Sequence, residues 1–268
     1  MNLENFKTII WDFYKENGRS FAWRHIDDPY KVLVSEIMLQ QTQTQRVAEK
    51  YHIFIKRFTT IESLAQASLH DVLFYWQGLG YNRRGKYLYE TAKKISQEYH
   101  NRVPDCPEIL LNFPGIGPYT ASSICAFAYN KPTIFIETNI RAVFIHFFFK
   151  DFNKVHDKEI LPLVAQTVDS QKARDWYYAL MDYVVMLKKS VINPSRKSKH
   201  HAKQSTFEGS DRQIRGKVLK ALTENKELHF EQLLEASNHD VPRLSNILEQ
   251  LINEHLIANR GSIFFIAR

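Results

Sequence analysis

The sequence predicts an all-α fold for the first 190 residues, followed by a small C-terminal domain that ends in a pair of strands. Apolar residues recur three and four positions apart through those 190 residues, which is the spacing of amphipathic helices. Strand-like alternation is nearly absent before the C-terminus. The breaks between apolar stretches are short and contain glycine or proline, as turns between helices do. With 268 residues, 44% of them hydrophobic, the chain can bury one large core or two moderate ones.

The helices are expected in order along the chain wherever this spacing persists. The apolar sets that predict them are Phe6-Ile9-Ile10-Phe13, Tyr30-Val34-Ile37-Met38, Ile53-Phe54-Phe58, Val72-Leu73-Trp76, Tyr87-Leu88-Ala92-Ile95 and Trp176-Leu180-Val184. The breaks are Pro29, Gly78-Leu79-Gly80, Pro104 with Pro107, and Gly115-Ile116-Gly117. Many short helices with short connections predict a compact bundle and not a coiled coil.

The pattern changes after the last of these helices. Residues 191–209 are basic and polar without apolar periodicity, so we predict a linker. Residues 210–268 are predicted to form three helices and a strand pair around Asn259-Arg260-Gly261, the layout of a winged-helix-like domain. Acidic and basic residues roughly balance in this domain, which leaves open both DNA contact and a protein-docking or stabilising role.

The charge balance favours a polyanionic partner. Lys and Arg outnumber Asp and Glu by 36 to 29, a formal net charge of +7. No apolar run approaches the roughly 20 residues of a membrane span, and the start lacks the layout of a secretory signal. We therefore expect a cytoplasmic protein without membrane contact. Cys106 and Cys125 are the only cysteines, too few for a four-cysteine metal site, and both are expected to be buried thiols.

The stretch FPGIGPYTA, residues 113–121, places two glycines in a chain that has only nine. A G-x-G loop between two helices turns where a Cβ would clash, and the N–H groups at the start of the second helix can bind phosphate. Pro118 fits the first helical position. Gly115, Gly117 and Thr120 are thus candidate DNA contacts that fix register without reading sequence. A plain Gly-Pro turn is the alternative.

Three motifs in order resemble a known family: WRHIDDPYKVLVSEIMLQQTQTQRV (23–47), WQGLGYNRRGKYL (76–88) and LLNFPGIGPYTASSI. They are similar to the helix-hairpin-helix DNA glycosylases of the endonuclease III (HhH-GPD) type, closest to the MutY-like adenine branch, through roughly residues 20–190. The resemblance implies a two-lobed helical fold, with residues 1–20 and 133–190 in one lobe and 21–132 in the other. It also implies a monomeric enzyme that acts on double-stranded DNA with a mispaired or damaged base.

Glu36 is the candidate general acid. It lies on an otherwise apolar helix face, where burial would raise the pKa of its carboxyl and let it hold a proton near neutral pH. The resemblance implies that it protonates adenine at N7; the alternative is an exposed helix glutamate. Gln40 and Gln41 would contact bases. Tyr81 resembles the family's wedge tyrosine, and Arg83 beside it is a further candidate DNA contact.

The second carboxylate is Glu137, where the family has aspartate to stabilise the positive charge developing on the sugar. The extra methylene moves the carboxylate by roughly 1.5 Å, one carbon–carbon bond. Either the backbone is set back to compensate or the site is impaired, and the helix-start pattern of Glu137-Thr138-Asn139 favours compensation.

Tyr119 stands where the family has lysine in enzymes that also cut the strand, serine in adenine glycosylases, and tyrosine in a group acting on thymine or uracil opposite guanine. Tyrosine cannot form a Schiff base, so we predict a monofunctional glycosylase.

No cofactor is expected. The adenine branch carries an iron–sulfur cluster whose first ligand would fall at Leu187 or a neighbour, yet no cysteine follows. The basic run with Lys199 would replace the DNA-facing loop of the cluster, or it is only a solvated linker; a monovalent ion in the hairpin stays open.

The sequence thus predicts a DNA glycosylase of base excision repair that hydrolyses the glycosidic bond of a mispaired adenine. Thymine or uracil opposite guanine is the alternative substrate, and a non-catalytic DNA-binding protein is the alternative of another class.

Overall fold

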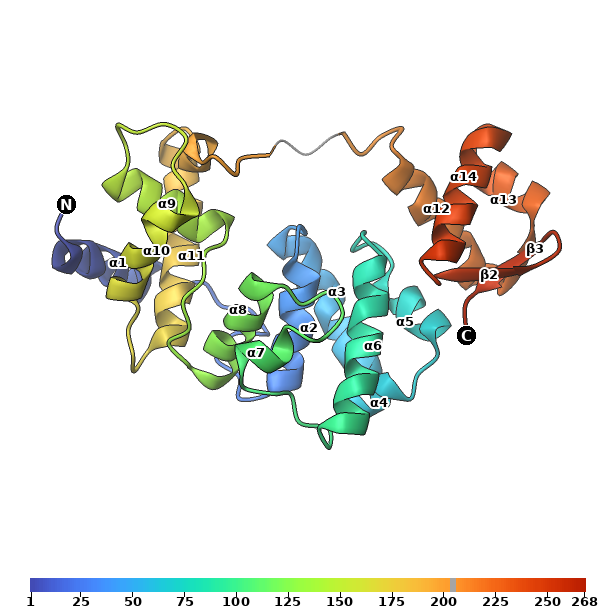
Figure 1. The fold of residues 1–268 in the computed structure, drawn as a ribbon, viewed down its shortest axis with the longest axis horizontal. Helices are drawn as coiled ribbons and strands as arrows, with labels where there is room; N and C mark the ends of the chain where they lie inside the picture. The colour runs from blue at the N-terminus through green and yellow to red at the C-terminus, as the bar shows by residue number, and fades with distance from the viewer. Residues whose placement is uncertain (203–205) are drawn as a thin grey trace. The chain divides into compact units, whose positions relative to one another are not determined.

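The computed structural model describes residues 1–202 and 206–268, which form two compact units (Figure 1). Among the described residues, the first comprises residues 1–33, 104–112 and 116–202, and the second comprises residues 34–103, 113–115 and 206–268. Within these ranges, the chain passes from one unit to the other after residues 33, 103, 112 and 115. The lobe and domain boundaries expected from the sequence stay a prediction.

The first unit is helical and is organised around one long helix, α11. Its elements are α1 (Leu3–Asn17), the first turn of α2 (Pro29–Leu39), α7 (Pro107–Leu110), α8 (Pro118–Tyr129), α9 (Thr138–Phe148), α10 (Asp157–Thr167), α11 (Ala173–Ser190) and a 3₁₀ turn, η1 (Pro194–Lys197). Helices α1, α8 and α9 pack on α11, whose Trp176 and Tyr177 are fully buried. Large aromatic side chains thus supply much of the apolar area that stabilises this unit.

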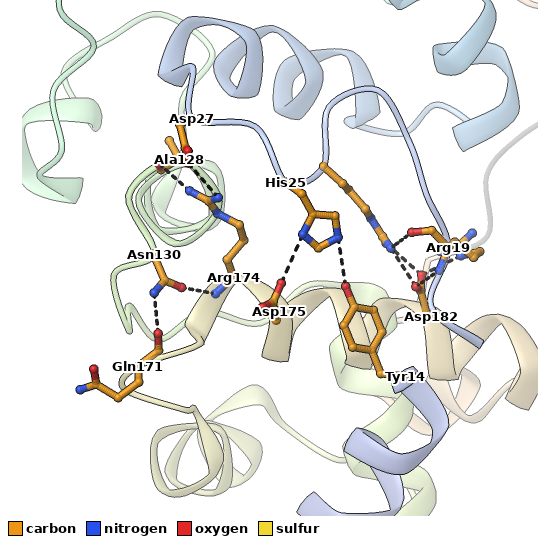
Figure 2. A network of polar contacts seen from close by, with 11 residues as sticks. Tyr14, Arg19, His25, Asp27, Ala128, Asn130, Gln171, Arg174, Asp175 and Asp182 are labelled. Atoms are coloured by element: carbon orange, nitrogen blue, oxygen red, sulfur yellow. Dashed lines mark hydrogen bonds and ion pairs between the residues drawn. The ribbon is translucent and has the colours of Figure 1, made fainter. Parts of the chain in front are cut away.

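A buried ion-pair network ties the loop after α1 to α11 (Figure 2). Asp182 on α11 accepts both guanidinium Nη atoms of Arg24, at 2.8 and 2.9 Å, and the Nε of Arg19, at 2.6 Å. The Arg24 guanidinium also lies over the Tyr178 ring. The buried charges of Arg24 and Asp182 compensate each other, and Arg19 is partly exposed, so that no charge is buried without a partner.

The same helix holds the end of α8. Arg174 donates to the carbonyl of Ala128, and the Arg174 N–H donates to the side chain of Asn130, the left-handed residue that caps α8 (Figure 2). The Asn130 amide in turn donates to the carbonyl of Gln171 at 2.6 Å. These bonds fix α8, whose first turn carries the candidate Tyr119, against α11.

The second unit combines short helices with the C-terminal domain. Its elements are the rest of α2, then α3 (Thr44–Arg57), α4 (Ile61–Ala65), α5 (Leu69–Trp76), α6 (Arg83–Glu98), α12 (Asp211–Asn225), β1 (Glu227–His229), α13 (Phe230–Ser237), α14 (Val241–Asn253), β2 (Ile257–Arg260) and β3 (Ile263–Ile266). The three strands form an antiparallel sheet in the order β1-β3-β2. Three helices and a hairpin were expected here and are present; β1 was missed, because three residues are too few for an alternating pattern.

The core of the C-terminal domain continues into α5. Leu69 and Leu73 of α5 are buried in the same apolar cluster as Ile214, Val218 and Leu222 of α12. The domain is therefore packed on the helices of its unit through a shared hydrophobic core, whose burial from water is the main favourable contribution to such packing.

Two further expectations are tested by the fold. Cys125 is buried, as expected, but Cys106 is partly exposed and its thiol donates to the Glu108 carboxylate, so the expectation of two buried thiols was wrong for Cys106. The predicted linker, residues 191–209, contains η1, and its residues 203–205 lie outside the described part. Among the described residues, none of the helices is both long and apolar enough to cross a membrane.

Candidate functional site

Glu36 lies in the part of α2 that is buried on all sides. The residue is only 7% exposed, and its neighbours in sequence, Ser35 and Ile37, are buried as well. Residues 32–38 are all buried. The exposed-glutamate alternative is therefore wrong, and the carboxyl has the enclosed environment that a general acid needs.

Arg84 on α6 holds the end of α2 and the loop of residues 78–80 together, a role that the sequence reasoning missed. The residue is 8% exposed, and burial lowers the pKa of its guanidinium to about 10, so it is still charged at neutral pH. Its bonds go to the carbonyls of Ile37, Met38, Gln40, Leu79 and Gly80 and to the Thr42 hydroxyl. The signal was present in the sequence, because Arg84 shares the helical spacing of the buried Leu88, Thr91 and Ile95.

The two glutamines after α2 have different environments. The Gln40 amide donates to the carbonyl of Gly115 at 3.2 Å, so it ties this loop to the hairpin. Gln41 is exposed and has a left-handed backbone, with φ 54°. Of the two, Gln41 presents its side chain to solvent, where a DNA base could be reached; the DNA contact of both stays a prediction.

Tyr81 follows two glycines with positive φ, Gly78 at 89° and Gly80 at 71°, and is itself left-handed at 47°. Such a conformation costs a non-glycine residue about 1–3 kcal/mol and is found at functional sites where the surroundings hold it. Its hydroxyl accepts a hydrogen bond from Arg212 of α12 at 2.8 Å. Arg83, expected to contact DNA, is 50% exposed at its side chain and pairs with Glu254 of the C-terminal domain.

The hairpin consists of α7, the loop of residues 111–117 and α8. Its two glycines differ in backbone conformation and in the space around them. Gly115 has φ 73°, and a Cβ there would come within 2.8 Å of the Tyr87 ring. Gly117 caps α8 with φ −90°, and a Cβ there would have no protein atom within 4 Å, so the expected clash was wrong for Gly117. Pro118 is confirmed at the first helical position. Thr120 is buried, so only its backbone could bind phosphate.

Glu137 is confirmed at the start of a helix, as the N-cap of α9. Its Oε1 accepts the N–H groups of Asn139, at 2.6 Å, and of Ile140, at 2.9 Å. Burial raises the pKa of this carboxyl, while the two N–H groups and the positive charges of Lys188 and Arg141 oppose the rise. Because one oxygen serves both N–H groups, the second oxygen is not needed for capping.

Lys188, near the end of α11, is the residue in this neighbourhood that the sequence reasoning missed. Its Nζ donates to the Asn139 side chain at 2.7 Å. Burial lowers the pKa of Lys188, and the Glu137 carboxylate partly restores it. Lys188 is thus bonded to the side chain of the residue whose backbone N–H donates to Glu137.

Tyr119 packs beside the extended segment that leads to Glu137. Its ring meets Phe135 edge-on, with centroids 5.6 Å apart, and Phe135 stacks on Tyr177 at 4.0 Å. The Tyr177 hydroxyl donates to the carbonyl of Thr133 at 2.6 Å, and the Thr133 hydroxyl to that of Ser122. The first unit therefore brings Tyr119 and the segment before Glu137 together.

Lys199 is exposed, and its N–H donates to the carbonyl of Val155 at 3.0 Å. Close by in sequence, a pocket of about 530 Å³ is lined by apolar residues and by the basic residues Lys150, Lys154, Arg196 and Lys197. Clustered cations suit phosphate, but the DNA contact expected of Lys199 stays a prediction.

The residues present do not fit an iron–sulfur cluster. A cluster of this kind takes four cysteine ligands, whereas α11 is followed by no cysteine at all. Among the described residues, no group of three or more His, Cys, Asp or Glu side chains could hold a metal ion.

Comparisons with known proteins agree with the geometry. The family profile described as HhH-GPD superfamily base excision DNA repair protein matches residues 34–161. The adenine DNA glycosylase of Mycobacterium tuberculosis is 41% identical over 137 residues, which are 51% of this chain and 45% of that protein. The thymine/uracil-DNA glycosylase of Methanothermobacter thermautotrophicus is 28% identical over 186 residues, covering 68% of this chain and 84% of that protein.

Among solved structures, a thermostable thymine-DNA glycosylase matches with a TM-score of 0.62 and 27% identity, over 69% of this chain and 86% of that one. The chain spans about half the length of the adenine DNA glycosylases that it matches. The expected fold, helical and of the endonuclease III type, is confirmed.

Proposed function

We propose that this chain, whose residues 34–161 match the HhH-GPD superfamily of base excision DNA repair proteins, is a DNA N-glycosylase that releases a mispaired base from duplex DNA. The observation that carries the proposal is the contrast between its two carboxyls. Glu36 is enclosed in α2, whereas two backbone N–H groups and the positive charges of Lys188 and Arg141 oppose the rise that burial causes in the pKa of Glu137. Carboxyls placed in different environments can divide the acid and charge-stabilising roles.

In this mechanism the target nucleotide is extruded from the duplex before reaction. Glu36 donates its proton to the departing base while the bond to the sugar breaks. The ionised Glu137 stabilises the positive charge that develops on the sugar. Water then adds at the sugar carbon and loses a proton, which restores the Glu36 carboxyl, so that the products are a free base and an abasic site.

Adenine is the favoured base. The Glu36 motif matches the adenine branch, whose members act on a leaving group that must be protonated, and the 41% identical relative is an adenine DNA glycosylase. We propose further that the enzyme works as a monomer, in the cytoplasm, on double-stranded DNA and without an iron–sulfur cluster. With Tyr119 in the lysine position, it releases the base without cutting the strand.

Thymine or uracil opposite guanine is the second candidate substrate, and one observation favours it. The thymine/uracil-DNA glycosylase is matched over 84% of its length, against 45% for the adenine enzyme, and Tyr119 agrees with that branch. The two candidates differ in the chemistry of the leaving group and share the rest of the mechanism.

The test is single-turnover base release on labelled duplexes containing A:G, A:8-oxoguanine, T:G and U:G pairs, developed with and without alkali. We expect free adenine from one of the A-containing duplexes and strand breaks only after alkali. Release of thymine or uracil instead would move the protein to the second candidate. No release from any duplex would contradict the proposal and favour a DNA-binding protein without catalysis.

A further inference from the structure

The C-terminal domain is fastened to the helices of its unit at several points, and the first is apolar. Leu69 and Leu73 of α5 enter the core of the domain. They belong to the same buried apolar cluster as Ile214 and Val218 of α12. The domain is thus held in a fixed orientation on α5.

Polar contacts fix the same orientation along α6. The Glu254 carboxylate, after α14, pairs with Arg83 of α6 and with Arg215 of α12, and its backbone carbonyl accepts the Lys86 ammonium at 2.7 Å. The two arginines hold the pKa of the Glu254 carboxyl low against the effect of burial. Gln77, just before the loop of residues 78–80, donates to Thr223 of α12.

This docking brings one cation of the domain onto the candidate wedge. Arg212, in the first turn of α12, donates from Nη1 to the Tyr81 hydroxyl at 2.8 Å and from Nη2 to the carbonyl of Thr206 at 3.3 Å. Its guanidinium carbon lies 5.6 Å from the centre of the Tyr81 ring, and that of Arg84 lies 5.5 Å from it. Arg84 comes from α6, so two different elements contact one ring.

A tyrosine that enters a base stack must present its ring in one direction before the DNA arrives. Tyr81 lies at the end of a loop with three positive φ angles, a backbone that alone would allow the loop several arrangements. A charge-assisted hydrogen bond to the hydroxyl restricts the rotation of the side chain more than a neutral one would. Preorganisation of this kind lowers the entropy lost when the ring is inserted into the duplex.

We propose that the C-terminal domain takes part in base excision through Arg212, a positioning residue that fixes the ring of Tyr81 for insertion into the duplex. The inference rests on the proposed function, because it assigns to Tyr81 the wedge role. It also decides between the roles left open for the domain: the domain acts by docking on its own chain and not by independent DNA reading. The opposite arrangement, in which Arg212 restrains Tyr81 until DNA displaces it, is an outcome that the test distinguishes.

The test is a double-mutant cycle with Arg212→Ala, Tyr81→Phe and the double variant, in the full chain. Tyr81→Phe removes the hydroxyl and keeps the ring. We measure the single-turnover rate of base release, the dissociation constant for the duplex, and the fluorescence of 2-aminopurine placed next to the mispair, which reports local unstacking. Arg212→Lys is the conservative rescue. Arg260→Ala is the matched control, since Arg260 is an ion-paired arginine of the same domain, bonded to Glu227 on β1.

We expect Arg212→Ala to slow base release about tenfold, the effect of losing one charge-assisted bond, and to reduce the 2-aminopurine signal. The duplex affinity should change less than about threefold. Arg212→Lys should recover part of the rate, the double variant should equal Tyr81→Phe alone, and Arg260→Ala should match the wild type. Additive effects, or an unchanged or faster Arg212→Ala, would overturn the proposal, and the faster rate would point to a restraint that DNA displaces.

The failure of the proposed function is separable from this. If the wild type released no base from any duplex, the glycosylase proposal would fail, while the 2-aminopurine signal would still report insertion of Tyr81. A signal reduced in Arg212→Ala would then support the positioning role, and an equal signal would overturn it.

Discussion

The neighbourhoods of the two candidate carboxylates are built in opposite ways. Glu36 lies in the middle of a helix whose residues 32–38 are buried, and the carbonyls of the next two residues accept hydrogen bonds from Arg84. Glu137 lies at the first turn of a helix, and its order comes from backbone N–H groups. One glutamate thus lies within a buried helical segment, and the other caps the start of a helix.

The largest expected effect comes from disrupting the hydrogen bonds at the end of the helix that carries Glu36. Arg84→Ala leaves several buried carbonyls without a donor, and each such loss costs about 1–3 kcal/mol. We expect the free energy of unfolding to fall by about 3 kcal/mol or more, measured by urea denaturation. Arg83→Ala is the matched control, because Arg83 is the neighbouring residue and its side chain is half exposed. A loss of stability in Arg83→Ala as large as in Arg84→Ala would contradict the role assigned to Arg84.

Glu137→Asp sharpens the comparison at the capping side. Aspartate is a good N-cap, so stability should change by less than about 1 kcal/mol. If the backbone compensates for the longer side chain, shortening it displaces the carboxylate, and the single-turnover rate should fall about ten- to a hundredfold. A faster Glu137→Asp enzyme would show that the natural glutamate impairs the site.

The two hairpin glycines are expected to separate folding from DNA binding. Gly115→Ala forces a left-handed alanine against Tyr87 and should cost about 1–3 kcal/mol of stability. Gly117→Ala meets no protein atom within 4 Å and should cost less than about 1 kcal/mol. Its effect should instead be a weaker duplex affinity, measured by fluorescence anisotropy at fixed salt; unchanged affinity would argue against a phosphate contact at Gly117.

The smallest effect concerns pH and Glu137. Because its pKa is raised in the folded state, the native protein binds this proton more tightly than the unfolded chain does. Deprotonation of this carboxyl therefore lowers the stability of the fold progressively, as the pH rises above the ordinary pKa of glutamate and through the raised pKa of the folded state. Glu137→Gln removes this dependence and keeps an acceptor oxygen for the cap, so its stability relative to the wild type should increase between pH 4 and 8. A constant difference would contradict the raised pKa.

Local sequence patterns predicted much of the site. Gly117 before Pro118 and Glu137 before Thr138 marked helix starts that the structure confirms, because caps and first turns depend on neighbouring residues. The apolar spacing around Glu36 correctly indicated its burial. Such signals need no knowledge of distant parts of the chain.

Contacts made by residues far apart in sequence could not be predicted. Lys188 reaches Asn139, 49 positions away, and Arg212 reaches Tyr81, 131 positions away. Residues such as these show no sequence periodicity from which their contact partners could be predicted. The docking of the C-terminal domain on α5 was hidden for the same reason, since Leu69 and Leu73 already fitted a helix of the bundle.

The central claim is that Glu36 and Glu137 perform the chemistry, and its most direct test is the single-turnover rate of Glu36→Gln and Glu137→Gln beside the wild type on the preferred duplex. We expect both rates to fall at least about a hundredfold, the range for a general acid and for an electrostatic stabiliser, with duplex affinity unchanged within about threefold. A variant that keeps the wild-type rate would contradict the role assigned to that carboxyl.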